Sequence, residues 1–362
     1  MTHAFGKPLT RTEDPRLLRG EALFVDDVHL PNTLHAAFLR SPHAHARIVA
    51  IDTNAAKARP GVHAIFIAED LGAYWQPGPL LVPPPPIEGA VFRQRCQVPL
   101  AKGTVRHLGE PVALVLAESR YIAEDAVRYD RGASIPMETR GIVADWDRRA
   151  DRMTIWDTTQ APVVIRNGLA AMLGLSERQL RVVAPNIGGG FGPKMMMFYP
   201  EEVLIPWAAL RLHRPVKWIE DRLEHFTATT HERLQIHDAE IALDEDGRIL
   251  AVRDRFLHDT GAYDPYGLTV PINSQCTLLG PYVVPAYDST FTAVFTNRTL
   301  VTPYRGAGRQ HGVFVIERLL DIAARELGLD RAEIRRRNLI PADAFPYDRR
   351  VIYQDFSRLC YD

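Results

Sequence analysis

Two glycine-rich stretches carry the residue types best suited to hold a polar ligand. The first reads GGGFGPK at 188–194, and the second reads YRGAGR at 304–309. Glycine has no Cβ, so a turn built from it can aim backbone N–H groups at an anion or a polar oxygen. In the second stretch Arg305 and Arg309 flank the glycines, and a guanidinium beside open amides suits a phosphate, carboxylate or oxo ligand. A single turn of this kind is more often a tight packing corner, but two of them weaken that interpretation.

The spacing of the glycines argues against two common phosphate-binding motifs. A dinucleotide fingerprint GxGxxG starting at Gly190 would need a glycine at the position that Met195 occupies. A Walker A loop needs a glycine directly before its lysine, whereas Pro193 precedes Lys194. The sequence therefore supports neither a dinucleotide-binding fold nor a phosphate-transfer loop.

Cysteine and histidine form no recognisable metal site in this sequence. The histidine pairs at 43/45 and 225/231 have no carboxylate or cysteine at ligand spacing, which favours packing or surface roles. The three cysteines are far apart, and their scarcity suits a reducing compartment. They are Cys96, Cys276 and Cys360.

The overall charge excludes two classes of partner. The chain has 362 residues, 43 of them basic and 44 acidic, which gives a formal net charge of -1. Nothing in this balance attracts nucleic acid or a membrane surface. The N-terminus has no apolar signal region, and no stretch approaches the roughly 18 apolar residues that span a bilayer. We expect a cytoplasmic protein of two or three domains without a membrane span.

The first part of the chain predicts a mixed α/β domain. Residues 1–20 resemble an extended arm, and the stretches that follow alternate apolar and polar residues as strands do. A proline-rich loop at 77–89 is more typical of a surface connector than of a docking site. Strands are expected at 22–28, 33–41, 46–52, 61–70 and 111–119, and helices at 54–60 and 120–127.

In the second part of the chain each glycine turn precedes a helix. These helices are expected at 200–213 and 312–329, and the second has a predicted buried face formed by Val315, Leu319, Ile322 and Ala323. Strands are also expected at 141–147, 152–160, 216–222 and 287–297, a helix, turn and strand at 163–186, a hairpin at 234–263 and a short basic helix at 331–340. The last twenty residues are expected to be irregular.

Taken together, these stretches resemble the molybdenum-cofactor-binding large subunit of the xanthine dehydrogenase, aldehyde oxidase and carbon monoxide dehydrogenase family. The resemblance covers nearly the whole chain. It is carried in order by residues 11–48, PMETRG at 136–141, GGGFGPK at 188–194, HDTGAYDPYG at 258–267, TPYRGAGRQHG at 302–312 and residues 317–340. The implied fold class is α/β (α+β), with an extended arm at 1–20, a hammerhead-type domain at 21–127 and the first half of a molybdenum-cofactor-binding domain at 128–362.

The resemblance also implies a site at the two turns. A molybdenum–pterin cofactor would insert an oxygen from water into a substrate C–H bond, with no direct protein ligand to the metal. Phe191 and Gly192 would line the oxo side of the metal, with the Gly192 amide close to an apical oxygen. The residues implied in cofactor binding are Gly189, Gly190, Phe191, Gly192, Arg305, Gly306 and Ala307, and those implied in the substrate pocket are Met195, Tyr304 and Ala307.

Positions at which this sequence departs from the family pattern restrict the range of substrates that the resemblance implies. Purine-oxidising members have a glutamate where this chain has Met195, and a phenylalanine where it has Ala307. The second turn also lacks the cysteine used by copper-containing carbon monoxide oxidisers. The pattern is most similar to relatives that oxidise an aldehyde or an N-heteroaromatic ring.

Two features that the family normally has are not found in this sequence. The catalytic glutamate and the second set of pterin-binding loops would follow Asp362, so no general base can be named, and the connection at 127–131 is shorter than usual. The resemblance therefore implies one part of a divided hydroxylase, completed by a companion chain that shares the cofactor. The alternatives are a catalytically incomplete binding or assembly subunit and a truncated large subunit.

The resemblance implies further partners that carry electrons away. This chain has no cysteine set for an iron–sulfur cluster and no flavin motif. A small subunit with [2Fe–2S] clusters and a medium subunit with FAD are therefore expected, with the cofactor in its cytosine dinucleotide form and a small molecule as substrate.

Overall fold

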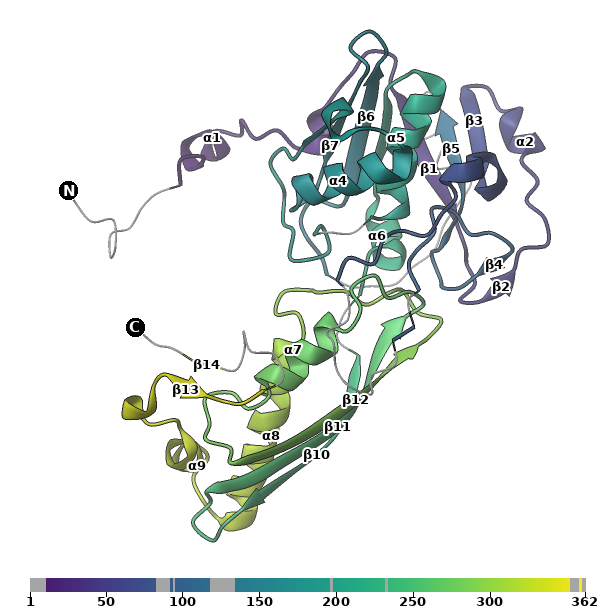
Figure 1. Ribbon diagram of the computed structural model, residues 1–362. Helices are drawn as coiled ribbons and strands as arrows, with labels where there is room; N and C mark the ends of the chain where they lie inside the picture. The colour runs from purple at the N-terminus through teal and green to yellow at the C-terminus, as the bar shows by residue number, and fades with distance from the viewer. Residues whose placement is uncertain are drawn as a thin grey trace.

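The computed structural model describes residues 11–82, 92–93, 95–117, 134–195, 198–231, 234–351 and 358–359. This part of the chain forms two lobes, each built on a β-sheet with helices packed against it (Figure 1). The upper lobe of Figure 1 contains a seven-stranded sheet and the lower lobe a three-stranded sheet. Across the described residues, every helix is too short or too polar to span a membrane.

The seven-stranded sheet takes strands from both sides of the predicted domain boundary at residue 127. In spatial order the strands are β3 (Val62–Ile67), β5 (Pro111–Ala117), β1 (Leu34–Arg40), β9 (Val216–Ile219), β6 (Gly141–Asp147), β7 (Arg152–Asp157) and β8 (Leu180–Val183). The junction is a short parallel pairing, in which Leu34 lies opposite Val216. The division into domains stays a prediction, but strands from both sides of it share one sheet.

The core of the upper lobe follows from its sequence patterns. Every residue of β5 is buried, as its continuous apolar run predicts, whereas β1 alternates between buried and half-buried residues. Helices α4 (Pro162–Leu173) and α5 (Pro200–Leu212) pack against this sheet, and α5 is buried along most of its length. Because α5 begins just after the first glycine turn, the buried helix anchors that turn.

The lower lobe holds the second glycine turn. Its sheet consists of β10 (Gln235–Leu243), β11 (Ile249–Gly261) and β12 (Ala286–Phe295), and the predicted hairpin is the antiparallel β10–β11 pair. Helices α7 (Thr269–Thr277), α8 (Arg309–Leu327) and α9 (Arg331–Asn338) belong to the same lobe. On α8, Val315 and Ala323 are buried as predicted, but Leu319 is half-buried and Ile322 is 39% exposed, so the face was placed slightly wrongly.

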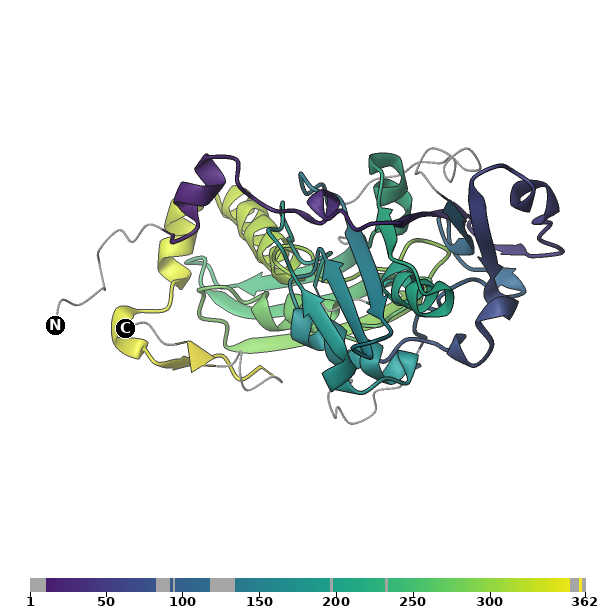
Figure 2. The same ribbon diagram turned by 90° about the horizontal axis from the view of Figure 1, so that it is seen from above.

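Several predicted elements differ in the structure. The expected strand at 22–28 is instead a 3-10 turn, η1 (Val25–Asp27), because the Asp27 carboxylate accepts the N–H of Phe24. The arm is not extended throughout, since α1 (Asp14–Leu18) is helical, and Figure 2 shows the segment after it running along one side of the upper lobe. Helices α6 (Arg222–Ala228) and α7 were missed.

Smaller elements complete the described fold. The expected strand at 46–52 is reduced to β2 (Ala46–Arg47), paired with β4 (Thr104–Val105), and the helix at 54–60 is α2 (Asn54–Lys57). The end of the chain is not wholly irregular, because β13 (Tyr347–Asp348) pairs with β14 (Arg358–Leu359). Further 3-10 turns are η2 (Ala68–Tyr74), η3 (Glu177–Gln179) and η4 (Ala342–Ala344).

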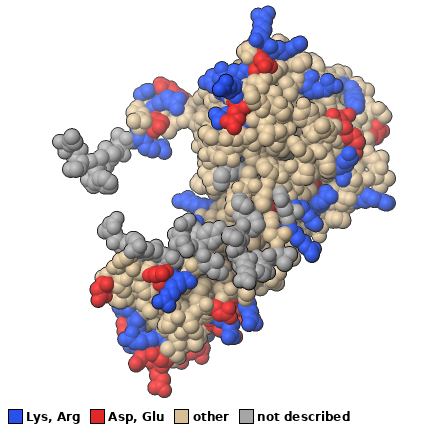
Figure 3. Space-filling model, in the orientation of Figure 1, with Lys and Arg blue, Asp and Glu red and all other residues tan. Residues whose placement is uncertain are grey.

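Some predictions lie outside the described residues. They concern the helix at 120–127, the shortened connection at 127–131 and residues 83–89 of the proline-rich loop. On the face that Figure 3 shows, basic and acidic side chains are interspersed, in keeping with the net charge of -1.

Candidate functional site

The two glycine turns, about 115 residues apart in sequence, are in direct contact. The Arg305 N–H donates a hydrogen bond to the Phe191 carbonyl oxygen at 2.8 Å. The Arg305 guanidinium carbon lies 5.8 Å from the centre of the Phe191 ring, within range of a cation–π interaction. A Cβ at Gly192 would lie less than 3.0 Å from the Pro303 carbonyl oxygen, so only glycine allows this approach. The structure thus brings the two predicted turns together into one surface.

Both turns have backbone conformations that disfavour ordinary residues. The φ angles are 101°, 53° and 106° at Gly189, Phe191 and Gly192, and 107°, 51° and 96° at Gly306, Ala307 and Gly308. Phe191 and Ala307 are not glycines, and a left-handed non-glycine residue stores strain that its surroundings must offset. Such strain clusters at ligand sites, and Phe191 is 39% exposed at the tip of its turn.

Helix α7 supports the second turn from behind. Asn273 Nδ2 donates to the Ala307 carbonyl oxygen at 2.9 Å, and Ser274 Oγ donates to the Gly308 carbonyl oxygen at 3.0 Å. Two side chains on successive residues of one helix therefore fix the carbonyl groups of the strained turn. This helix was not predicted, because Pro271 and several polar residues interrupt its apolar periodicity.

The residues predicted for a substrate pocket lie beside the turns. The Met195 N–H donates to the Gly192 carbonyl oxygen at 2.8 Å, and the Tyr266 hydroxyl donates to the Met195 carbonyl oxygen at 2.6 Å. Met195 and Tyr304 are both half-buried. Their backbone positions are fixed next to the turns, and their assignment to a pocket stays a prediction.

Gln160 is a site residue that the sequence reasoning missed. Its Oε1 accepts the Gly192 N–H at 3.0 Å, and a Cβ at Gly190 would clash with its side chain. The Gly192 amide, predicted to face an apical oxygen, is thus bound to Gln160. A polar residue just after the end of the strand at 152–157 was the available signal, because ligand-binding groups often follow strands.

Comparison of the chain with known proteins shows which protein family it belongs to. A family model described as "Molybdopterin cofactor-binding domain" matches residues 98–339, which is more than half of the chain. The chain belongs to this family. A second model, "Aldehyde oxidase and xanthine dehydrogenase, a/b hammerhead domain", matches residues 19–129. The two matches confirm the predicted fold class of a hammerhead domain followed by a molybdopterin-binding domain.

Relatives in the family differ in length. The chain is 33% identical to the nicotine 6-hydroxylase large subunit of Paenarthrobacter nicotinovorans, over 99% of this chain and 51% of the relative. The crystal structure of quinoline 2-oxidoreductase from Pseudomonas putida 86 superposes with a TM-score of 0.90 at 34% identity, covering 99% of this chain and 52% of that one. The chain spans about half the length of these two relatives. By contrast, it covers 88% of the nicotinate dehydrogenase large molybdopterin subunit of Eubacterium barkeri, at 27% identity and over 91% of this chain.

The exposed side of the paired turns fits the molybdenum–pterin group of this family. Gln160 Nε2 and the Arg305 guanidinium have no hydrogen-bond or ion-pair partner among the residues that the structure describes. Both are donors, and such donors suit the oxo and phosphate oxygens of a pterin cofactor. In the described ranges no cluster of three or more His, Cys, Asp or Glu residues could hold a metal.

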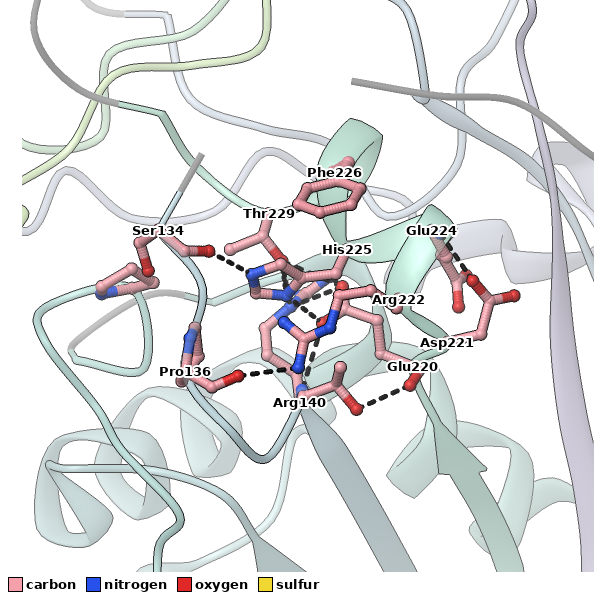
Figure 4. Close-up of polar contacts among 12 residues, drawn as sticks. Ser134, Pro136, Arg140, Glu220, Asp221, Arg222, Glu224, His225, Phe226 and Thr229 are labelled. Carbon is pink, nitrogen blue, oxygen red and sulfur yellow. Dashed lines mark hydrogen bonds and ion pairs between the residues drawn. The ribbon is translucent and has the colours of Figure 1, made fainter. Parts of the chain in front are cut away.

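A buried ion network connects the segment before β6 with α5, β9 and α6, and Figure 4 shows part of it. Arg140, which precedes β6, donates to Glu201 Oε2 on α5 at 3.0 Å and pairs with Glu220 at the end of β9. Burial alone would raise the pKa of Glu220, but the Arg140 guanidinium lowers it below the usual range. His225 on α6 contacts Glu220 Oε2 through Nδ1 and the Ser134 carbonyl oxygen through Nε2, each at 2.6 Å. The network joins the segments on either side of the first turn.

Two buried carboxyl groups, Asp157 and Glu202, lie beside this network. Burial raises the pKa of Asp157 to about 7, although Arg140 and Lys194 oppose the shift. Burial and the neighbouring Asp157 raise the pKa of Glu202 well above its usual value. Asp157 Oδ2 is buried and has no hydrogen-bond partner within the described chain. Burial thus favours the protonated form of both carboxyl groups.

An Asp157→Asn variant should change how stability depends on pH. The carboxyl pKa is 3.8 in a reference state and about 7 when folded, so the native state binds the extra proton between these values. The stability that this proton contributes is present below about pH 4 and lost as pH rises through 7. Above pH 7 the variant should exceed the wild type by about 1–3 kcal/mol, measured by urea unfolding at several pH values.

Asp238→Asn, at an exposed position on β10, is the matched control. It should leave the slope of stability against pH as in the wild type. If the two variants have the same slope, Asp157 is not a proton-holding group.

Proposed function

We propose that this chain forms one wall of the molybdenum-cofactor site of a hydroxylase that oxidises an aldehyde or N-heteroaromatic C–H bond. The observation that carries the proposal is the contact between the two glycine turns through Arg305 and Phe191. The names of the relatives support the substrate class, since nicotine and quinoline are both N-heteroaromatic compounds. Met195 and Ala307, in place of larger or charged residues, agree with a substrate other than a purine.

The residues of this chain would bind and orient rather than react. When bound, the molybdenum–pterin group would supply the two-electron oxidation in which water provides the oxygen. Gln160 Nε2 and the Arg305 guanidinium would donate hydrogen bonds to its oxygens. The Phe191 ring and the small Ala307 side chain would leave room for a flat substrate, with Met195 and Tyr304 beside them.

A companion chain would supply the opposite wall and the general base. The Eubacterium barkeri relative supports this division, because a protein of about this length is there described as one molybdopterin subunit. Subunits with [2Fe–2S] clusters and FAD would remove the electrons, and the cofactor would be the cytosine dinucleotide form. The expected place is the cytoplasm.

Co-expression with the companion chain tests this function. The purified complex should contain about one molybdenum per chain by mass spectrometry, and its metal should be reduced when quinoline or benzaldehyde is added without oxygen. Molybdenum without reduction by any such substrate would favour the binding or assembly alternative. A complex without molybdenum or pterin would contradict the proposal.

A further inference from the structure

One side chain holds both ends of the first glycine turn. Glu138, in the loop before β6, accepts through Oε2 the Gly188 N–H at 2.8 Å and Lys194 Nζ at 3.0 Å. Lys194 Nζ also donates to the Glu138 carbonyl oxygen at 2.9 Å, and the Glu138 N–H donates to the Gly188 carbonyl oxygen at 3.0 Å. The first and last residues of GGGFGPK are thus joined through one glutamate.

The pair differs from an ordinary surface ion pair. The Lys194 side chain is 0% exposed and that of Glu138 is 18% exposed. Burial lowers the pKa of Lys194, and the Glu138 carboxylate opposes this shift. An exposed ion pair contributes little, but a buried ammonium that loses its carboxylate is left uncompensated. The closure of the turn therefore depends on both charges.

Burying the Glu138 carboxylate costs free energy, so its presence indicates a role other than stabilising the fold. Glu138 Oε1 is buried and has no hydrogen-bond partner in the described part of the chain. A buried oxygen left unsatisfied calls for an explanation, and such groups recur where a site needs a fixed geometry. Gly188 is part of the same arrangement, because a Cβ there would lie less than 3.0 Å from the Glu138 Cβ.

The closed loop determines where its tip lies. Phe191 stands midway between the two held ends, has a φ of 53°, and accepts the Arg305 N–H through its carbonyl oxygen. If the ends separate, the strained tip can relax, and its contact with the second turn is lost. The contact between the turns thus depends on residues that lie behind them.

We propose that Glu138 and Lys194 are positioning residues that clamp the first glycine turn in the shape that binds the molybdenum–pterin cofactor. The proposal rests on the proposed function, since the ligand is the cofactor of that site. Neither side chain needs to touch the cofactor, because both act through the backbone of 188–194.

Four variants of the complex with its companion chain test the clamp. Glu138→Gln keeps an acceptor for Gly188 but removes the charge that Lys194 needs, and Lys194→Met removes the cation. The double variant removes both charges, so no buried charge is left alone. Glu317→Gln, which weakens the pairing of Arg335 at 2.6 Å in the lower lobe, is the control. The measurements are molybdenum per chain, the thermal midpoint and amide hydrogen exchange of 188–194, the last also in the cofactor-free chain.

Each single variant should lower the thermal midpoint, speed exchange at 188–194 and reduce retained molybdenum roughly ten- to a hundredfold. The double variant should recover the thermal midpoint but not the molybdenum, because the loop stays open. The Glu317→Gln control should lower the thermal midpoint but leave amide exchange at 188–194 and molybdenum content unchanged. Molybdenum that returns with the midpoint in the double variant, or unchanged exchange in the single variants, would overturn the clamp while leaving the proposed function intact. A wild-type complex without molybdenum would overturn both.

Discussion

An Arg140→Met variant is expected to lose about 3–5 kcal/mol of folding free energy, the usual cost of stranding a buried charge. Arg140 is 4% exposed and pairs with Glu201 and Glu220, whose side chains are 1% and 0% exposed. Its guanidinium also lies 3.8 Å from the centre of the Tyr199 ring. Methionine fills part of the volume but leaves Glu220 without its arginine and Glu201 with Arg40 alone, so much of the wild-type stability should be lost.

Urea unfolding followed by tryptophan fluorescence measures this loss, because Trp218 is buried and lies 5.2 Å from the Arg140 guanidinium. Arg166→Met is the matched control. Arg166 pairs with Glu177 at 2.9 Å, but their side chains are 36% and 56% exposed, so the change should stay within about 0.5 kcal/mol. Equal losses in the two variants would show that the buried network contributes no more than a surface pair.

A Gly192→Ala variant is expected to separate the two glycine turns. Gly192 has a φ of 106°, and an alanine Cβ there would clash with the Pro303 carbonyl oxygen. Backbone strain and the steric clash therefore act together. We expect a loss of about 2–5 kcal/mol in folding free energy. Because the Arg305–Phe191 hydrogen bond should break, the complex with its companion chain should also lose most of its molybdenum, measured by mass spectrometry.

A Gly174→Ala variant separates the effect of backbone strain from the effect of the steric clash. Gly174 ends α4 with a φ of 66°, and nothing lies within 4 Å of its would-be Cβ. Strain alone should then cost about 1 kcal/mol, with molybdenum content unchanged. If both alanine variants keep the metal equally well, the contact at Pro303 has no part in the site.

The local elements of the fold could be predicted where pattern and burial agree. The all-apolar run of β5, the alternation of β1, the hairpin of β10 and β11, and helix α5 all appear where expected. The failures have local chemical causes. In η1 a capping aspartate, Asp27, competes with strand formation, and in α7 a proline interrupts the apolar period.

The site could be predicted only in part, because its partners are distant in sequence. The density of glycines in the first turn predicts a backbone site for a polar ligand. In the structure three of these glycines make room for protein neighbours: Gly188 for Glu138, Gly190 for Gln160 and Gly192 for Pro303. No pattern within 188–194 could reveal these contacts, since each partner lies on another segment. The packing of these glycines against protein neighbours is thus observed, and their role in a ligand site stays a prediction.

The shared seven-stranded sheet limits how this protein can be recombined with its relatives. Arg40 at the end of β1 binds Glu201 on α5 and Glu224 on α6, while Leu34 and His35 pair with β9. A hammerhead domain transplanted from a relative would therefore need a basic residue to pair with Glu201 and Glu224. It would also need a strand whose edge can pair with β9. The two family matches overlap at residues 98–129, and the shared sheet makes a simple cut and rejoining there unfavourable. If the turns line the substrate site as proposed, substitutions within them disturb the shared sheet less than the exchange of a whole domain would.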